Sequence, residues 1–315
     1  MNLYELLLAQ KLSGGSGGSS GGGNTGGGSG GGSGGGEEWI GDGNTHIWIS
    51  LQEGRTSPML GVCPKGTVTV DWGDGSAPDT LTGTSTSTVK WTPNHEYGKA
   101  GDYVITLTVD GELGFSGSSS ANAFAYILRH SSAADARNQV YQSAVKKVEA
   151  GDGVTSIGSY AFKNCYGLTS IAIPDSVTLI SNNAFSDCYG LTSIAIPSGV
   201  TSIGSSVFYT CYNLASIAIP DGVTSIDSST FRGCYSLASI AIPSGVTSIG
   251  SQAFYGCSGV AYYDFTKHTA VPTMAATNAF NNISADCEIR VPASLVDEWK
   301  AATNWSTYAD KIVGV

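Results

Sequence analysis

The residue types that carry out catalysis are few and scattered in this chain. Its four His residues share no local spacing with one another or with a Cys or Glu, and no G-x-S-x-G motif is present. They are His46, His95, His130 and His268. Catalysis requires titratable groups that lie close together. We therefore predict no catalytic residues, no cofactor and no enzyme activity.

Two other groups have side chains that metal ions prefer, but their spacing argues against a metal site. Asp71, Asp74 and Asp79 lie around an Asp-Gly turn and do not supply the ligand sequence of an EF-hand loop. Five Cys recur every 23 residues, each three positions after a Phe, and no His accompanies them. They are Cys165, Cys188, Cys211, Cys234 and Cys257. Stacked thiolates in an apolar interior would be unfavourable, so buried thiols that act as small hydrophobic side chains are favoured.

A regular set of Tyr residues is a candidate ligand-binding surface. One Tyr follows the Cys of each of four repeats, at Tyr166, Tyr189, Tyr212 and Tyr235. If the Cys points inward, its neighbour points outward, and the four rings form a ladder along one edge. Tyr is amphipathic and suits contacts with proteins and sugars. Two interpretations stay open: the rings bind a ligand, or they pack on each other and cover the joints between coils.

The residues next to each repeated Phe differ from one repeat to the next. Tyr209, Arg232 and Tyr255 each follow a Phe directly. The segments L-(T/A)-S-I-A are instead nearly identical in every repeat. A specific ligand, a host-surface protein or a glycan, is therefore predicted to bind at these three residues or at the Tyr ladder.

The 23-residue period itself predicts the fold of half the chain. The unit reads V-T-S-I-x-x-x-x-(A/V/T)-F-x-x-C-Y-x-L-(T/A)-S-I-A-I-P, and a period of 20–29 residues is typical of leucine-rich-repeat solenoids. The motifs I-G-x-x-A-F-x-x-C at 157–165 and I-A-I-P at 171–174 resemble the BspA-like leucine-rich repeats. This resemblance covers residues 143–292 and implies a surface or adhesion protein. Residues 293–315 are predicted to form a C-terminal cap, with a capping box at Ser294–Asp297 and a short helix that buries Leu295, Val296, Trp299 and Ala302.

Residues 39–111 alternate in hydrophobicity and predict a small antiparallel β-sandwich. Predicted strands lie at 45–51, 67–72 and 103–109, with turns between them. D-W-G-D-G at 71–75, H-E-Y at 95–97 and G-D-Y-V-I-T-L-T-V at 101–109 resemble the PKD-like, immunoglobulin-like domain. This resemblance implies a spacer or adhesion module. Residues 112–142 are predicted to be a connector and N-terminal cap, and the first coil strand is predicted at 145–150.

The first 38 residues predict an anchor and a tether. Residues 1–12 can form one short helix with Leu3, Leu6 and Leu7 clustered on one side, which would order by docking on a virion or surface assembly. This start carries Glu5 and lacks a basic n-region, so it is a poor signal peptide. Residues 13–38 are rich in Gly and Ser and predict a flexible tether.

Composition excludes several classes of partner. Charged residues make up only 13% of the chain and the formal net charge is −10, with no Lys/Arg-rich run, so nucleic acid is not an expected partner. No run of 18 apolar residues exists that would predict a transmembrane segment. Cys63 and Cys287 lie outside the ladder, and the odd total of 7 Cys argues against a complete set of disulfides.

Together these features predict a non-catalytic recognition protein that faces the outside of a cell or particle. The main interpretation is a phage or prophage virion component, in the tail or capsid, because the start resembles short leaders of prophage structural proteins. The alternative is a bacterial cell-surface adhesin of the BspA-like kind.

Overall fold

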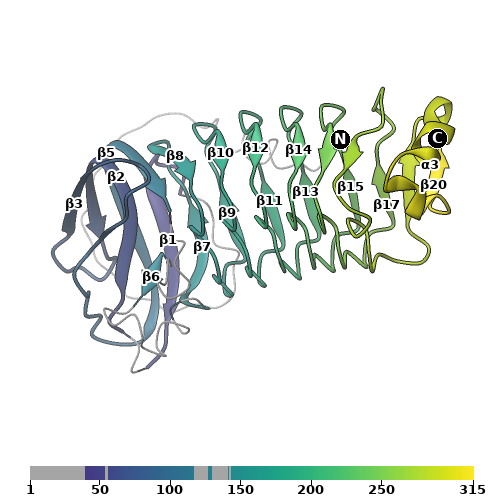
Figure 1. The fold of residues 1–315 in the computed structure, drawn as a ribbon. Helices are drawn as coiled ribbons and strands as arrows, with labels where there is room; N and C mark the ends of the chain where they lie inside the picture. The colour runs from purple at the N-terminus through teal and green to yellow at the C-terminus, as the bar shows by residue number, and fades with distance from the viewer. Residues whose placement is uncertain (1–39, 54–55, 117–126, 130–140, 142) are drawn as a thin grey trace, which may run out of the picture. The chain divides into compact units, whose positions relative to one another are not determined.

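The repeat closes into coils because its apolar positions all face one interior. In the computed structural model, the described residues are 40–53, 56–116, 127–129, 141 and 143–315. Figure 1 shows a β-rich module, a stack of parallel coils and a short helical cap, in that order. The prediction of a mainly β solenoid with a 23-residue period and a short C-terminal helix is confirmed. The predicted anchor and tether, residues 1–38, lie outside the described residues.

Each coil contributes strands to two rows that run along the solenoid. The first row consists of β7 (Val145–Glu149), β9 (Ser170–Ala172), β11 (Ser193–Ala195), β13 (Ser216–Ala218), β15 (Ser239–Ala241), β17 (Tyr262–Asp264) and β19 (Glu288–Val291). The second row consists of β8 (Val154–Ile157), β10 (Leu179–Ile180), β12 (Ser202–Ile203), β14 (Ser225–Ile226), β16 (Ser248–Ile249) and β18 (Thr273–Met274). Parallel pairing joins residues that are 23 apart in sequence, such as Ile194 and Ile217. Equivalent residues of successive repeats therefore lie beside each other.

A stack of Phe side chains fills the interior between the two rows. The rings of Phe162, Phe185, Phe208, Phe231 and Phe254 are fully buried. Their centroids are 5.4–5.8 Å apart, and successive planes differ by 1–10°. Phe115 and Phe280 extend this stack at its two ends, with centroid distances of 5.2 and 5.1 Å. One aromatic column therefore runs through all the regular coils.

Two long strands, β2 and β5, pair with each other and form the centre of the N-terminal module. Its strands are β1 (Thr45–Leu51), β2 (Met59–Asp71), β3 (Asp79–Thr84), β4 (Lys90–Trp91), β5 (Gly101–Phe115) and β6 (Leu128–Arg129). Strand β5 pairs antiparallel with both β1 and β2, and β2 also pairs with β3, β4 and β6. The strand predicted at 45–51 has the same bounds as β1, whereas β2 and β5 begin earlier than predicted and β5 ends later.

Trp72 is the centre of the module core. Its side chain is fully buried, and its ring stacks on His95 at a centroid distance of 4.4 Å. The Trp72 Nε1–H donates to Asp79 Oδ2 at 2.9 Å, and the Tyr97 hydroxyl donates to the Trp72 carbonyl at 2.9 Å. The His95 Nε2 lies 2.9 Å from Asp74 Oδ2. The motif residues that carry the PKD-like resemblance therefore hold one another in place, and the assignment to that family stays a prediction.

The same module covers the first coil of the solenoid. Strand β1 pairs antiparallel with β7, and β5 pairs in parallel with β8, so the module joins both rows of coil strands. The sequence predicts that residues 112–142 form this cap. Residues 113–115 of this stretch belong to β5 and pair with β8, and β1 adds the pairing with β7. Strand β5 runs continuously across the predicted domain boundary at residue 111. Strand β7 begins at Val145, as predicted.

The C-terminal cap closes the other end with aromatic side chains. It comprises the 3₁₀ turns η1 (Ala293–Leu295) and η2 (Trp305–Tyr308), the helix α3 (Val296–Ala301) and the strand β20 (Ile312–Gly314). Trp299 and Trp305 are fully buried, and their ring centroids lie 4.9 and 5.6 Å from that of Phe265. The helix face predicted from sequence therefore packs on the core.

The capping box predicted at Ser294–Asp297 is wrong. The N-cap residue of α3 is Leu295, and no side chain there accepts a hydrogen bond from the first turn. Ser294 lies within the preceding 3₁₀ turn, so its hydroxyl is not in the N-cap position.

Replacing one ring of the Phe stack should destabilise the whole solenoid. Phe208→Ala is expected to lower the free energy of unfolding by about 3–5 kcal/mol, because it opens a cavity against two neighbouring rings. Denaturant titration followed by circular dichroism measures this loss. The exposed control Ser236→Ala should change stability by less than about 0.5 kcal/mol. Equal stability of Phe208→Ala and Ser236→Ala would contradict this account of the core.

Candidate functional site

A tight turn after each Phe places the Tyr ladder on the outside of the coils. The residue two positions after the Phe has a positive φ, as at Asn164 (61°), Asp187 (63°) and Thr210 (55°). The Tyr amide then donates to the carbonyl of that residue, at 3.0 Å for Tyr189 and 2.8 Å for Tyr212. The chain thus turns sharply between the Phe that faces the interior and the Tyr that faces solvent.

The four rings of the ladder stack face to face. Centroids are 4.9 Å apart from Tyr166 to Tyr189, 4.8 Å from Tyr189 to Tyr212 and 5.1 Å from Tyr212 to Tyr235, with planes within 17°. Tyr235 is 52% exposed, and the other three are half-buried. The rings therefore pack on each other, as the packing interpretation predicts, and still present an ordered aromatic edge to solvent. Whether this edge binds a ligand stays a prediction.

Burial makes the hydroxyls of the two inner ladder residues, Tyr189 and Tyr212, hard to ionise. Burial raises the pKa of Tyr189 to about 12, and the Asp187 carboxylate and the two neighbouring Tyr add to this rise. Burial also raises the pKa of Tyr212, with contributions from Tyr235, Asp187 and Tyr209. Tyr189 and Tyr212 therefore keep neutral hydroxyls at the ladder edge.

The second set of predicted binding residues forms one cluster beside the ladder. The Arg232 guanidinium lies over the rings of Tyr209 and Tyr255, at 5.4 and 4.9 Å from their centroids. Arg232 Nη1 donates to Gln252 Oε1 at 2.8 Å. The Tyr255 hydroxyl accepts a hydrogen bond from Asn282 Nδ2 at 2.7 Å. The structure thus brings together three candidate residues from successive repeats. The two rings and the Gln252 side chain hold the Arg232 guanidinium in one orientation.

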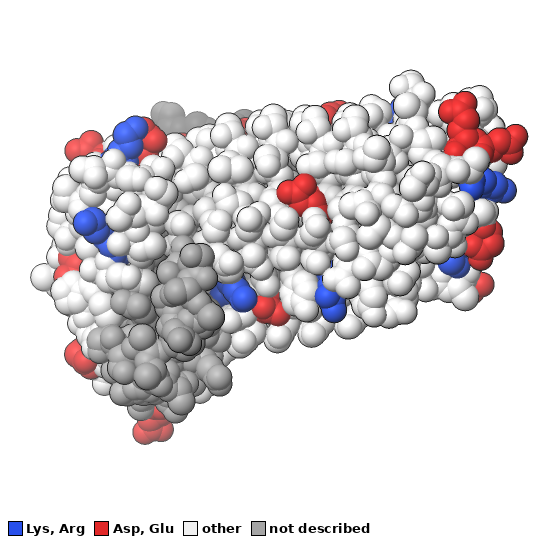
Figure 2. Space-filling model, viewed as in Figure 1, with Lys and Arg blue, Asp and Glu red and all other residues white. Residues whose placement is uncertain are grey.

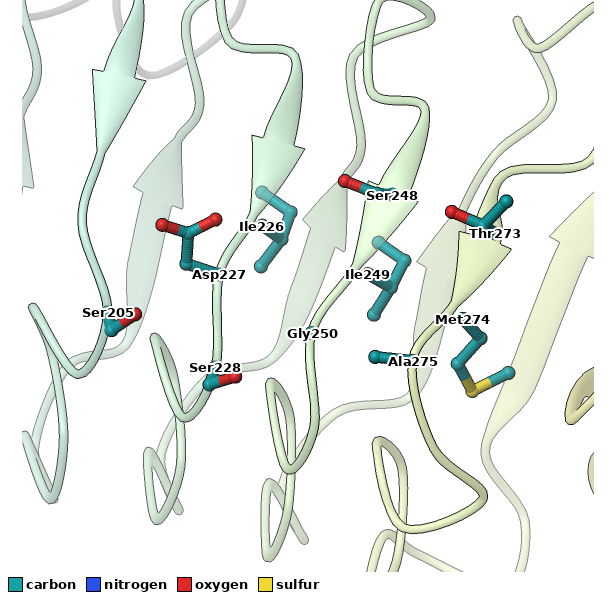
Figure 3. A pocket seen from close by; sticks show the side chains of 10 residues that line it. All are labelled: Ser205, Ile226, Asp227, Ser228, Ser248, Ile249, Gly250, Thr273, Met274 and Ala275. Atoms are coloured by element: carbon teal, nitrogen blue, oxygen red, sulfur yellow. The ribbon is translucent and has the colours of Figure 1, made fainter.

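A groove that sequence reasoning missed lies on the second row of strands. It has a volume of about 410 Å³, and its lining includes Asp227, Ser205, Ser228 and Gly250. Figure 3 shows the Asp227 carboxylate leaning toward the coil that carries Ser205. Asp227 Oδ1 accepts a hydrogen bond from Ser225 Oγ at 3.0 Å. The Asp227 carboxylate can accept hydrogen bonds from a cationic or hydroxyl-rich ligand. General acid–base catalysis would need a second titratable group, and Asp227 is the only one among the residues that line this groove.

The signal for this groove is a departure from the repeat. Asp227 occupies the position that follows V-T-S-I, where Gly204 and Gly250 stand in the adjacent coils. A Cβ at Gly250 would lie 2.5 Å from the Ser228 amide nitrogen, so this position cannot carry a side chain without local rearrangement. The Asp227 side chain therefore has a glycine at the equivalent position of the coil on each side.

The residues considered for calcium binding have structural partners. Asp71 Oδ1 accepts from the Gly73 amide, Asp74 Oδ1 from the Ser76 amide, and Asp79 from Trp72. Within the described residues, no group of three or more His, Cys, Asp or Glu is placed to hold a metal ion. His130 and the anchor residues Leu3, Leu6 and Leu7 lie outside those residues.

The surface along the solenoid carries little charge. Figure 2 shows isolated acidic and basic side chains on one face of the coils, with wide uncharged areas between them. None of the helices in the described part of the chain is both long and apolar enough to span a membrane.

Comparison with known proteins identifies the repeats. Residues 137–261 match the family model for the BspA type leucine rich repeat region, in six copies. This part of the chain is similar to the BspA type leucine rich repeat region. The match does not extend to residues 39–111, where the PKD-like resemblance stays a prediction, and no curated protein matches the chain.

Several solved structures of repeat proteins are similar to this chain. A T. pallidum leucine rich repeat protein is 29% identical, with a TM-score of 0.40, over 44% of this chain and 65% of its own. A leucine rich cell surface protein from Faecalibacterium prausnitzii is 21% identical, with a TM-score of 0.31, over 56% and 66%. A leucine-rich repeat protein from Bacteroides ovatus is 24% identical, with a TM-score of 0.28, over 47% of this chain and 55% of its own. The chain thus spans just under two thirds of the first two proteins.

The Cys of the 23-residue repeats act as packing residues. All seven Cys in the chain are buried and unpaired. The thiol of each Cys from the second ladder position onward donates to the carbonyl of the Phe 26 residues earlier, at 3.0–3.2 Å. Burial raises the pKa of Cys165 and of Cys257 to about 12. The prediction of buried thiols in the core is therefore confirmed.

These thiols should be inert in the native protein. At pH 9 a thiol with a pKa of about 12 is only about 0.1% thiolate, and the thiolate is the reactive species. Ellman's reagent is therefore expected to label none of the ladder Cys until guanidinium unfolds the chain, when all 7 become reactive. The control Ser244→Cys adds one exposed thiol, which should react in the native state. Rapid labelling of the native ladder would contradict its burial.

Proposed function

We propose that this chain is a non-catalytic recognition protein, displayed at a cell surface, that binds a host-surface protein or a glycan. The ordered Tyr ladder carries this proposal. Rings that are already stacked lose little conformational freedom on binding, and Tyr and Arg are enriched among the residues that dominate interfaces. The Arg232 cluster beside the ladder adds a fixed cation to the same surface.

The Tyr residues are not needed to close a coil, which favours a role in binding. The position after the Cys is Ser258 in the fifth coil, and the equivalent residue in the next coil is Ser284. Both coils form with the same Phe stack and backbone pairing. A ladder that the fold does not require is more readily explained by a ligand than by coil closure.

The cell surface is supported better than a virion. The BspA-type repeats that match residues 137–261 resemble those of surface and adhesion proteins. The virion interpretation depended on residues 1–12, which lie outside the described residues, and none of the comparisons supports it. A role without catalysis agrees with the structural partners of the Asp and Cys candidates.

Removal of the last two rings of the ladder should weaken recognition. The double variant Tyr212→Ala/Tyr235→Ala is expected to bind at least about tenfold more weakly to host-cell or glycan arrays, because it removes two adjacent contact rings. Tyr262→Ala, which removes a half-buried Tyr on β17, is the matched control and should bind normally. Thermal unfolding is the check that both variants are folded. Unchanged binding by the double variant would remove the ladder from the binding surface.

The proposed location has its own test. Intact cells that produce the protein should expose it to a membrane-impermeant biotin reagent, with an internal cytosolic protein as the unlabelled control. Recovery of the chain only with purified virions, and not from labelled cells, would overturn the cell-surface assignment and favour the particle.

A further inference from the structure

We propose that the open end of the Tyr ladder binds an uncharged sugar ring, stacked on the face of Tyr235 that is turned toward Ser258. This inference rests on the proposed function and specifies the ligand class of the same surface. The ligand would occupy the place that a fifth Tyr would take.

The ladder ends at Tyr235 because the next position is Ser258. Each inner ring has a Tyr neighbour about 5 Å away, whereas Tyr235 has one only on the side of Tyr212. Its exposure of 52% agrees with an uncovered ring face. This end of the column therefore has a flat aromatic floor and a short hydroxyl side chain in place of a ring.

The surroundings of this face are small and polar. A Cβ at Gly256 would lie 3.5 Å from Tyr235 Cε1, so the backbone of Gly256 runs along the ring edge without a side chain to cover it. Ser236, Ser258 and Gly259 are exposed. Tyr255, which precedes Gly256, presents a hydroxyl paired with the Asn282 amide. The polar side chains next to the ladder end in sequence and in the repeat are therefore the Ser236 and Ser258 hydroxyls.

This combination favours a sugar over the two other ligands that stack on Tyr. A partner's aromatic side chain would need an apolar pocket that excludes water, and the exposed rim of Ser and Gly does not provide one. A cation would need an acidic partner, and the residues next to this ring face, Ser236, Ser258 and Gly259, carry no negative charge. The C–H groups on one face of a pyranose carry partial positive charge and match the negative face of the ring, while its hydroxyls match the polar rim.

Saturation-transfer NMR on the full chain tests this site directly. The probes are the methyl glycosides of glucose, galactose, mannose and N-acetylglucosamine, each at about 10 mM, a concentration suited to millimolar dissociation constants. At least one should receive saturation from the protein. Ser258→Arg should weaken that glycoside at least fivefold, because its guanidinium would cover Tyr235 as Arg232 covers Tyr255. The neutral variant Ser258→Gln fills the same space and should have the same effect.

Two controls test whether binding depends on the Tyr235 ring face rather than on added charge or on the Tyr235 hydroxyl. Ser198→Arg adds the same charge at an exposed position away from the ladder end and should leave binding unchanged. Tyr235→Phe keeps the ring and should bind within twofold of the original chain. Lack of transfer to all four glycosides would overturn the proposal. So would unchanged binding in both Ser258 variants, or loss of binding in Tyr235→Phe.

The outcome is independent of the adhesion test. If the chain binds a host surface and the Ser258 variants bind it equally well, the sugar site is wrong and the recognition role stands. If glycosides bind at Tyr235 but no host surface is recognised, the sugar site stands and the proposed function is wrong.

Discussion

Each coil of this protein is held by the contact of its Phe and Cys with the coil before it. The Phe ring stacks on the preceding Phe, and from Cys188 to Cys257 the thiol donates to the carbonyl of that same preceding Phe. A thiol and a ring from one coil thus contact one residue of the previous coil. This double contact fixes the register of stacking, because a shift by one residue would separate both at once.

Because the register is fixed, equivalent residues of successive coils lie beside each other on the outer surface as well as in the interior. The Tyr ladder follows from this, because residues 23 apart must lie about 5 Å apart. The same constraint makes each departure from the repeat a local feature beside regular coils. Asp227 between two glycines, and Ser258 after four Tyr, are such features. Specific recognition on this scaffold is therefore expected where the repeat changes.

A stack of equal coils leaves two open ends, and different structures close them. At the first coil, β1 and β5 continue the two rows of strands into the N-terminal module. At the last coil, Trp299 and Trp305 cover Phe265. Both ends replace the missing neighbouring coil with backbone pairing or with large buried rings. The repeats can thus stay nearly identical in sequence, because the end structures cover the core side chains that the first and last coils would otherwise expose to water.

The sequence by itself determined the period, the interior residues, the bounds of β1 and the start of the first coil strand at Val145, because these follow from local periodicity. It also selected Tyr209, Arg232 and Tyr255 as candidates. Only the tertiary structure showed that these three are in contact, that β5 joins the module to the solenoid, and that Asp227 lines a groove. Such features depend on which distant segments pair, and the hydrophobic pattern along one segment does not contain that information.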